Sequence, residues 1–288
     1  MTSRVRASQT ISLGLAGLAL VGLALLMQHT GASAAGERST EYVGQRPSGA
    51  VPTGTYLHVS SGMGTGTGNT RNMTFSCDPG DELLSGGFSS IDQGTHVAGN
   101  RPVSKRTWRL TWINDATVDS VSVWIFCGDG IAPGSYSLET STGFSDYFGT
   151  NCPTNGSEGV VVGGWYGIRK TNFVERSAPT DIQSWFVRTS DFGDDHSVQS
   201  ICLDFDSNDG GPANTGVGVP GNANQDSTLE TSCSNPATEV AAGGGFAGLA
   251  PGSHLREARP SSGDTFKITW HNDATVDTVT VHIDCMAP

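Results

Sequence analysis

The stretch Trp108–Cys127, WRLTWINDATVDSVSVWIFC, occurs a second time near the end of the chain as Phe266–Cys285, FKITWHNDATVDTVTVHIDC. The six residues Asn-Asp-Ala-Thr-Val-Asp are unchanged between the two segments. A third, diverged copy, WFVRTSDFGDDHSVQSIC, runs from Trp185 to Cys202. Each segment predicts a strand, a polar turn and a second strand that ends in cysteine. The sequence therefore indicates one unit that is used three times.

The spacing of cysteine, glycine and aromatic residues is shared by all three copies. The two cysteines of a copy are separated by 50, 50 and 52 positions, and a Gly-Gly-aromatic step follows each first cysteine. A proline comes fourteen residues after that aromatic residue, and another aromatic residue comes six after the proline. An even number of cysteines at this interval predicts one disulfide per copy, whereas the alternative is bridging between copies through Cys127–Cys152 and Cys202–Cys233. The predicted pairs are Cys77–Cys127, Cys152–Cys202 and Cys233–Cys285.

The period of two along each strand predicts which side chains face the core. In copies one and three, an aromatic, an aliphatic and a second aromatic residue share one face. We expect these stripes to pack in the core, with the second tryptophan of each stripe, near the strand end, as the candidate for exposure. The Gly-Gly pairs predict a bulge or a close approach between strands. The stripes are Trp108, Leu110 and Trp112, and Phe266, Ile268 and Trp270.

The first residues of the chain predict a secretory signal. Arg4 and Arg6 precede an apolar run from Ile11 to Met27, and small residues at 32–35 offer a cleavage site. A single membrane anchor is the alternative, because the run approaches spanning length. Cleavage would change the formal net charge from −12 to about −14, and so acidic a chain should repel nucleic acids and anionic membranes. We expect a secreted, extracellular protein with no nucleic-acid partner and no membrane contact after cleavage.

Composition and recurrent strand patterns predict an all-β protein. Only 15% of the residues are charged, while 39 are glycine. The predicted segments are a signal peptide at 1–35, a flexible Gly/Ser/Thr/Pro-rich lead-in at 36–70, and repeats at 71–130, 131–205 and 206–288, the last with a preceding linker. The repeats could close into one pseudo-threefold β-prism or barrel, or stand as tandem small β-sandwiches. The closed form is favoured, because each copy alone offers a thin core.

Copies one and three share polar features that copy two lacks. A histidine lies eight residues after the Gly-Gly-aromatic step and an arginine precedes the shared proline, where copy two has phenylalanine and alanine. With the Asn-Asp turns, these residues predict two loop sites for a carbohydrate or cell-wall ligand, because arginine is a forked donor and asparagine and aspartate match hydroxyl groups. The alternative is a solvated hairpin that was copied by duplication. The candidate ligand-binding residues are His96, Arg101, Asn114, Asp115, His254, Arg259, Asn272 and Asp273.

Signals of metal binding and catalysis are weak in this sequence. Asp204, Asp206 and Asn208 resemble the start of a calcium loop, but the glycine falls one position late and no acid closes the loop, so an acidic linker turn is favoured. The sequence contains no Gly-x-Ser-x-Gly or His-Glu-x-x-His motif. We predict no cofactor and favour a non-catalytic surface- or envelope-associated protein. The alternative is a secreted hydrolase, or a hydrolase inhibitor, whose site no motif reveals.

The ordered pattern Cys, Gly-Gly-Phe, Pro, Trp, Asn, Val-x-Val and Cys resembles repeat modules of uncharacterised secreted actinobacterial proteins. This resemblance covers nearly the whole mature chain and implies no activity. The stretch GDDHSVQSIC at 193–202 is similar to part of vitelline membrane outer layer protein, a β-prism of three sheets. That second resemblance implies a three-sheet fold. The repeats here are much longer, so no function is carried over from it.

Overall fold

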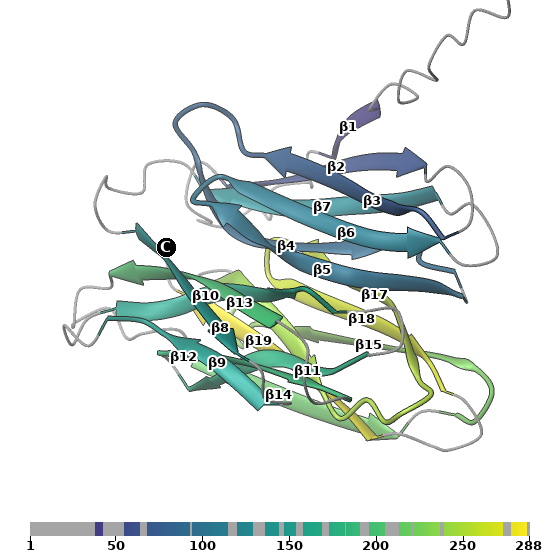
Figure 1. The fold of residues 1–288 in the computed structure, drawn as a ribbon. Helices are drawn as coiled ribbons and strands as arrows, with labels where there is room; N and C mark the ends of the chain where they lie inside the picture. The colour runs from purple at the N-terminus through teal and green to yellow at the C-terminus, as the bar shows by residue number, and fades with distance from the viewer. Residues whose placement is uncertain are drawn as a thin grey trace, which may run out of the picture. The chain divides into compact units, whose positions relative to one another are not determined.

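Branched and aromatic residues alternate with polar ones along much of the chain, which favours extended strands. Nineteen strands and no helix occur in the described part of the computed structural model, all within the unit Ala34–Pro288 (Figure 1). None of the described residues belongs to a helix with the length and hydrophobicity of a membrane span. The predicted all-β class is confirmed. The structure describes residues 38–42, 55–63, 68–92, 94–114, 120–128, 136–143, 147–153, 158–168, 173–181, 183–190, 196–204, 213–220, 222–236, 239–272 and 278–286.

Each copy supplies six strands in the same order. Copy one holds β2 (Thr55–Met63), β3 (Thr70–Ser76), β4 (Glu82–Ser89), β5 (Thr95–Ser104), β6 (Thr107–Asn114) and β7 (Ser120–Gly128). Copy two holds β8 (Tyr136–Gly143), β9 (Tyr147–Asn151), β10 (Glu158–Tyr166), β11 (Val174–Asp181), β12 (Ser184–Thr189) and β13 (His196–Asp204). Copy three holds β14 (Ala213–Pro220), β15 (Asp226–Ser232), β16 (Val240–Ala247), β17 (His254–Ser262), β18 (Thr265–His271) and β19 (Thr278–Met286). The additional strand β1 (Arg38–Tyr42) pairs with β2.

The strand β2 corrects the prediction of a flexible lead-in at 36–70. It pairs with β7 along its whole length, from Thr55 opposite Gly128 to Met63 opposite Ser120. β8 and β14 pair in the same way with β13 and β19, so copy one begins before residue 71. The physical reason is that β7 has one edge free after pairing with β4, and its backbone N–H and C=O groups require partners there.

Two copies build each of three sheets. β4 pairs with β17, β10 with β5 and β16 with β11, so copy one joins copy three, copy two joins copy one, and copy three joins copy two. This cycle excludes a row of independent sandwiches, and the three sheets remain separate rather than forming one barrel. Sheet A has the order β1-β2-β7-β4-β17-β18-β15, sheet B the order β3-β6-β5-β10-β13-β8, and sheet C the order β14-β19-β16-β11-β12-β9.

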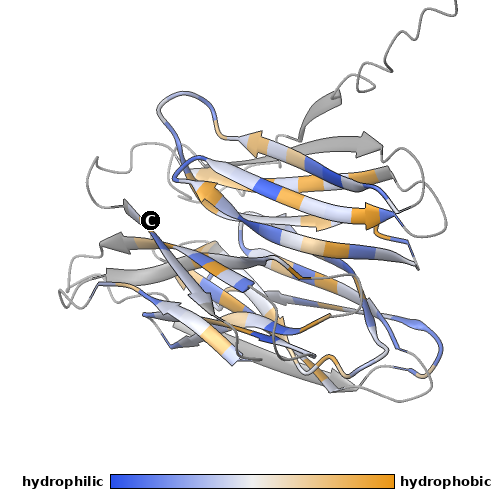
Figure 2. Cartoon of the chain, viewed as in Figure 1, coloured by the Kyte–Doolittle hydropathy of each residue, from blue (hydrophilic) through white to orange (hydrophobic). Residues whose placement is uncertain are grey.

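One hydrophobic cluster contains residues from all three copies, and hydrophobic and hydrophilic residues alternate along the strands that surround it (Figure 2). Trp108, Trp185 and Phe266 are buried at equivalent positions in this cluster, as their shared spacing predicted. Trp112 and Trp270, the candidates for exposure, are buried as well, so neither is an exception to the core packing of the stripes. Both belong to the same cluster, which extends to the ends of β6 and β18.

The Gly-Gly pairs serve two different close contacts. A Cβ atom on the first glycine, Gly163 in copy two, would lie 2.4 Å from the ring of Trp185 in the same copy. A Cβ atom on the second glycine, Gly164, would lie 1.9 Å from the backbone oxygen of Asn100 in copy one. The other two copies repeat both contacts. The first glycine therefore makes room for a core ring, and the second lets the neighbouring copy's strand approach.

The buried aromatic rings differ in whether they need a polar partner. Trp108 Nε1 donates to Asn100 Oδ1 at 2.7 Å, and Trp185 Nε1 donates to Ser177 Oγ at 3.1 Å. In copy three the ring is Phe266, and the residue that pairs like Asn100 and Ser177 is Ala258. A buried indole N–H is costly without an acceptor, whereas a phenyl ring has no such group. Each copy thus matches its ring to the residue on the adjacent strand.

The predicted disulfides Cys77–Cys127, Cys152–Cys202 and Cys233–Cys285 are all confirmed. In each copy the first cysteine also donates its backbone N–H to a carbonyl oxygen in the hairpin between the fourth and fifth strands, at 2.8–2.9 Å. Each disulfide closes a loop of about 50 residues and contributes on the order of 4 kcal/mol in the chain-entropy model. The three disulfides therefore join equivalent positions in the three copies.

Candidate functional site

The structure places the predicted ligand-binding residues on strands and at strand ends rather than on free loops. His96 and Arg101 belong to β5, and His254 and Arg259 belong to β17. Asn114 ends β6, and Asn272 directly follows β18. Asp115 and Asp273 lie outside the described residues, as do Asp206 and Asn208 of the calcium candidate, whereas Asp204 ends β13.

The burial of the two asparagines corrects their assignment to a ligand site. Asn114 and Asn272 are both fully buried. Asn272 Nδ2 donates to the backbone oxygen of Asn222 at 3.1 Å, and its Oδ1 accepts from Trp270 Nε1 at 3.0 Å. The side chain thus links the end of β18 to the segment before β15. It is unavailable to an external ligand.

The two histidines meet at one small cavity rather than forming two separate sites. His96 and His254 line a space of about 50 Å³ together with Phe173, the residue at the equivalent position of copy two. His96 Nε2 lies 3.3 Å from the backbone oxygen of Ile168. The cavity has room for water but not for a sugar ring. The three residues lie at the same distance in sequence from the Gly-Gly-aromatic step of their copies, and this equal spacing was the sequence signal that they occupy equivalent positions.

Arg259 lies within a compensated charge network on sheet A. Its guanidinium group stacks 3.7 Å above the ring of Trp124, and its Nε donates to Glu257 Oε1 at 2.5 Å. Lys267 Nζ lies 3.3 Å from Glu257 Oε2 and 3.8 Å from Glu230 Oε1. Two cations and two carboxylates therefore face one another across β17, β18 and β15. The ion pairs lie within copy three, and the stacking of Arg259 on Trp124 connects them to copy one.

Arg101 occupies the equivalent position on sheet B but has different neighbours. Its guanidinium group lies 4.1 Å above the ring of Tyr166, and Arg109 stands directly opposite it on β6. Burial, and secondarily the charge of Arg109, lower the pKa of Arg101 from its ordinary value. Neither Arg101 nor Arg109 forms an ion pair with a described residue. Arg101 and Arg259 are equivalent in sequence, but Arg101 faces a second cation whereas Arg259 faces a carboxylate.

A groove of about 590 Å³ lies at the junction of copies two and three, where no site was predicted. Tyr147 lines it and stacks on Phe186 with 4.9 Å between ring centroids. Arg188 Nε forms an ion pair with Glu175 Oε2 at 2.9 Å in the same groove. We call this the sheet C groove. It is lined by Tyr147, Glu175, Arg176, Arg188 and residues 247–251.

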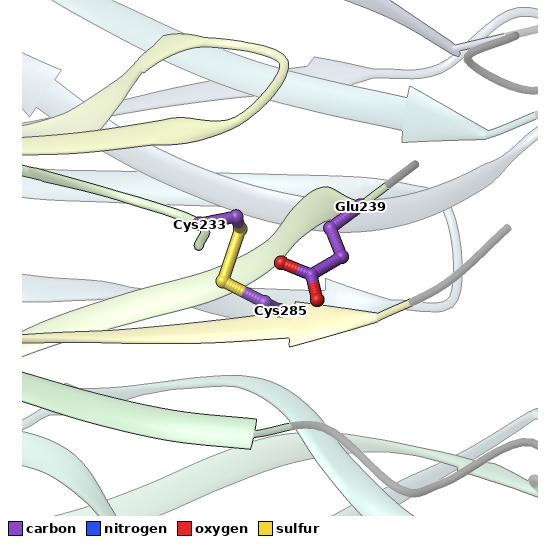
Figure 3. A group of neighbouring side chains, drawn as sticks. All are labelled: Cys233, Glu239 and Cys285. Atoms are coloured by element: carbon purple, nitrogen blue, oxygen red, sulfur yellow. A yellow bond between two sulfur atoms is a disulfide. The ribbon is translucent and has the colours of Figure 1, made fainter. Parts of the chain in front are cut away.

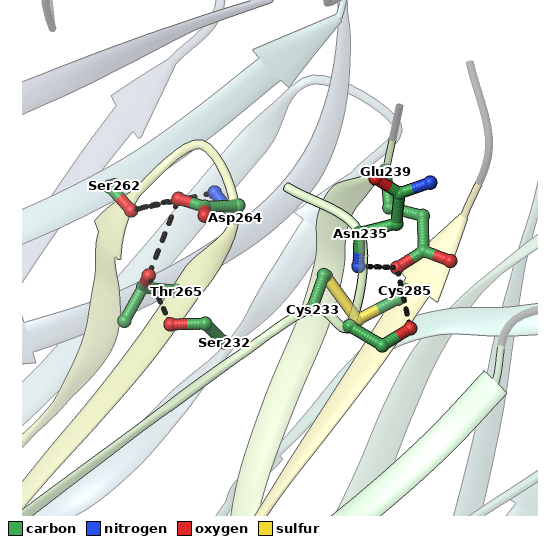
Figure 4. The surroundings of a disulfide bond; sticks show 9 residues. Ser232, Cys233, Asn235, Glu239, Ser262, Asp264, Thr265 and Cys285 are labelled. Atoms are coloured by element: carbon green, nitrogen blue, oxygen red, sulfur yellow. Dashed lines mark hydrogen bonds between the residues drawn. A yellow bond between two sulfur atoms is a disulfide. The ribbon is translucent and has the colours of Figure 1, made fainter. Parts of the chain in front are cut away.

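Glu239 lies close to the third disulfide. Its carboxylate lies beside the sulfur atoms of Cys233 and Cys285 (Figure 3), a cluster of the composition that can hold a metal ion. The two sulfur atoms are bonded to each other, so they are not available as thiolate ligands. Glu239 Oε2 instead accepts from the backbone N–H of Asn235 at 2.9 Å and from Ser234 Oγ at 3.2 Å (Figure 4). The carboxylate closes a turn.

Two titratable groups on β19 have pKa values shifted by burial. Burial raises the pKa of Asp284 well above its ordinary value, and Asp284 Oδ2 is buried without a hydrogen-bond partner. Burial, and secondarily the charge of Arg176, lower the pKa of His282 to about 4. The residues that correspond to Asp284 in the other copies are Phe126 and Ile201, both buried. The carboxyl group therefore occupies a position built for an apolar side chain.

We expect Asp284→Asn to raise the melting temperature at pH 7 and to leave it nearly unchanged at pH 3. The folded protein holds the Asp284 proton to higher pH than the unfolded chain does, so this group costs stability as the pH rises above about 4. His282 acts in the opposite direction, since its contribution is lost as the pH falls from about 6.5 towards 4. His282 is present in both the original protein and the variant, so its contribution cancels when their melting temperatures are compared. Calorimetry at both pH values checks this, and an equal gain at pH 3 would contradict it.

No protein-family model matches the chain, and a search of curated proteins finds no significant match.

Proposed function

We propose that this protein is a secreted, non-catalytic binding protein that takes a carbohydrate or cell-wall glycan in the sheet C groove. Tyr147 carries the proposal, because 46% of its surface is exposed although its ring stacks on Phe186. A ring held in this way offers a rigid apolar face at little cost in conformational entropy. Glu175, Arg176 and Arg188 add donors and acceptors for hydroxyl groups beside it.

The groove supports binding better than it supports hydrolysis. A hydrolase would be favoured by carboxyl groups with shifted pKa values in one pocket. The described carboxyl groups with raised pKa values are Glu82 and Asp284, and neither lines the sheet C groove or the histidine cavity. Glu175, which does line the groove, is paired with Arg188. The alternative of a hydrolase or hydrolase inhibitor therefore receives less support from these residues.

Secretion is supported indirectly by the disulfides and by the sequence of the first residues. All six cysteines are bonded in pairs, which fits an oxidising compartment. The apolar run from Ile11 to Met27 and the small residues after it predict a cleaved signal. A glycan or cell-wall partner would be met in that compartment.

Retention on insoluble cell-wall material tests the proposed function. We expect the secreted protein to be retained and Tyr147→Ala to weaken retention about five- to tenfold, because the stacking face is lost. Tyr147→Phe is the matched control, since it keeps the ring and removes only the hydroxyl group. Melting temperatures of all three proteins exclude unfolding as the cause. Equal retention of the folded Ala variant, or no retention of the unchanged protein, would contradict the proposal.

A further inference from the structure

Each copy carries an equivalent row of side chains across three neighbouring strands that ends beside its junction with the next copy, and the charges of the three rows differ. On sheet A the row is Glu230, Lys267 and Arg259, with Glu257 beside it. On sheet B the row is Thr74, Arg109 and Arg101, with Gly99 in the place of Glu257. On sheet C it is Gly149, Phe186 and Ala178. Sheet B thus keeps both cations of sheet A and has neither carboxylate.

The two arginines on sheet B are under-satisfied. Arg101 and Arg109 stand directly opposite each other on neighbouring strands, and like charges in that position destabilise a sheet. Arg101 Nε and Arg109 Nε are both buried without a hydrogen-bond partner. Buried donors of this kind are rare and costly in native structures. No carboxylate of the described residues forms an ion pair with Arg101 or Arg109, so the repulsion between them is not compensated there.

We propose that Arg101 and Arg109 bind one oxyanion, a carboxylate, sulfate or phosphate group, against the ring of Tyr166. An oxyanion accepts several charge-assisted hydrogen bonds at once from guanidinium groups, and it would offset the repulsion between the two cations. Tyr166 keeps the Arg101 guanidinium group in place, 4.1 Å from the ring centroid. This site lies on different residues from the sheet C groove and stands independently of the proposed function.

Anion binding at Arg101 and Arg109 receives no long-range attraction, because the chain as a whole is acidic. The formal net charge of −12 repels anions at long range, and salt screens this repulsion beyond about 8–10 Å. Binding therefore depends on the short-range fork geometry of the two guanidinium groups. We expect a weak site for an isolated ion. Thr74, which stands opposite Arg109 on β3, is uncharged and so supplies no carboxylate that would compete with the ligand.

Arginine Nε–Hε resonances give a direct test by nuclear magnetic resonance at constant ionic strength. We expect the Arg101 and Arg109 signals to shift saturably, with one shared dissociation constant, on titration with sodium sulfate and with glucuronate. The Arg259 signal, whose Nε already donates to Glu257, should not follow. Chloride is the control salt. Absence of a saturable shift, or an equal shift with chloride, would overturn the proposal.

Matched variants separate binding from folding. Arg109→Gln should weaken sulfate binding at least fivefold without lowering the melting temperature, because it removes the repulsion with Arg101. Lys267→Gln, at the equivalent position of sheet A, should leave sulfate affinity unchanged. Unchanged affinity in Arg109→Gln would refute the site. An oligouronate that binds more tightly than glucuronate would assign the anion to an acidic saccharide, and equal affinities would assign it to an isolated ion. Tyr147→Ala should leave both affinities unchanged.

Discussion

Gly164→Ala is expected to destabilise the protein by at least about 3 kcal/mol, although it adds a single methyl group. The added Cβ would lie 1.9 Å from the backbone oxygen of Asn100, and a backbone atom cannot move aside as a flexible side chain can. β10 would have to separate from β5, which breaks the junction of copies one and two. This places the effect at the upper end of overpacking costs. For a domain of this size the melting temperature should fall by about 6–12 °C.

Gly263→Ala is the matched control for this substitution. A Cβ at Gly263 would meet nothing closer than 3.7 Å, an ordinary contact with the ring of Phe126. We expect its melting temperature to stay within a few degrees of the original. Thermal denaturation followed by circular dichroism compares the two variants. If Gly164→Ala and Gly263→Ala behaved alike, the second glycine would not be the point at which copies approach.

Trp185→Ala is expected to cost about 3–5 kcal/mol, because it removes one of the largest buried rings and leaves a cavity. Ser177 Oγ would also lose the indole N–H that it accepts at 3.1 Å. Copy two is the most diverged in sequence, so this substitution tests whether it shares the fold of the other two. Urea denaturation measures the change. An unchanged unfolding midpoint would mean that copy two packs differently.

The double substitution Trp185→Phe with Ser177→Ala is the corresponding control. It installs in copy two the pair that copy three already uses, Phe266 against Ala258. We expect it to recover most of the stability that Trp185→Ala loses. Ser177→Ala alone should cost about 1–3 kcal/mol, because it leaves a buried N–H group without an acceptor.

Local features of the fold were predictable from the sequence, whereas the exchange of strands between copies was not. Alternation along Trp108–Trp112 gave the core face, and the constant cysteine interval gave the disulfides. The same periodicity fits a row of sandwiches equally well, because hydrophobic alternation does not say which copy supplies the neighbouring strand. Only the second glycine of each pair marks where the strand of another copy packs, because its close contact is with the backbone of that copy.

The candidate site was harder to predict, because pairing across strands decides what each polar residue does. Arg101 and Arg259 are equivalent in sequence, yet Glu257 neutralises one and Gly99 leaves the other without an acid. No site was predicted in copy two, because it lacks the shared histidine and arginine. It nevertheless contributes Tyr147 to the sheet C groove, since that groove is formed by residues of copies two and three together.

The pairing of β4 with β17 has a consequence during synthesis. Phe88 of copy one lies opposite Ala258 of copy three, so β4 leaves the ribosome with an open edge while the intervening residues are still being made. At about 5–20 residues per second this interval is on the order of ten seconds or more. One edge of β11 in copy two likewise stays unpaired until β16 of copy three has been synthesised. A product that ends after two copies would therefore expose two strand edges, which are templates for aggregation.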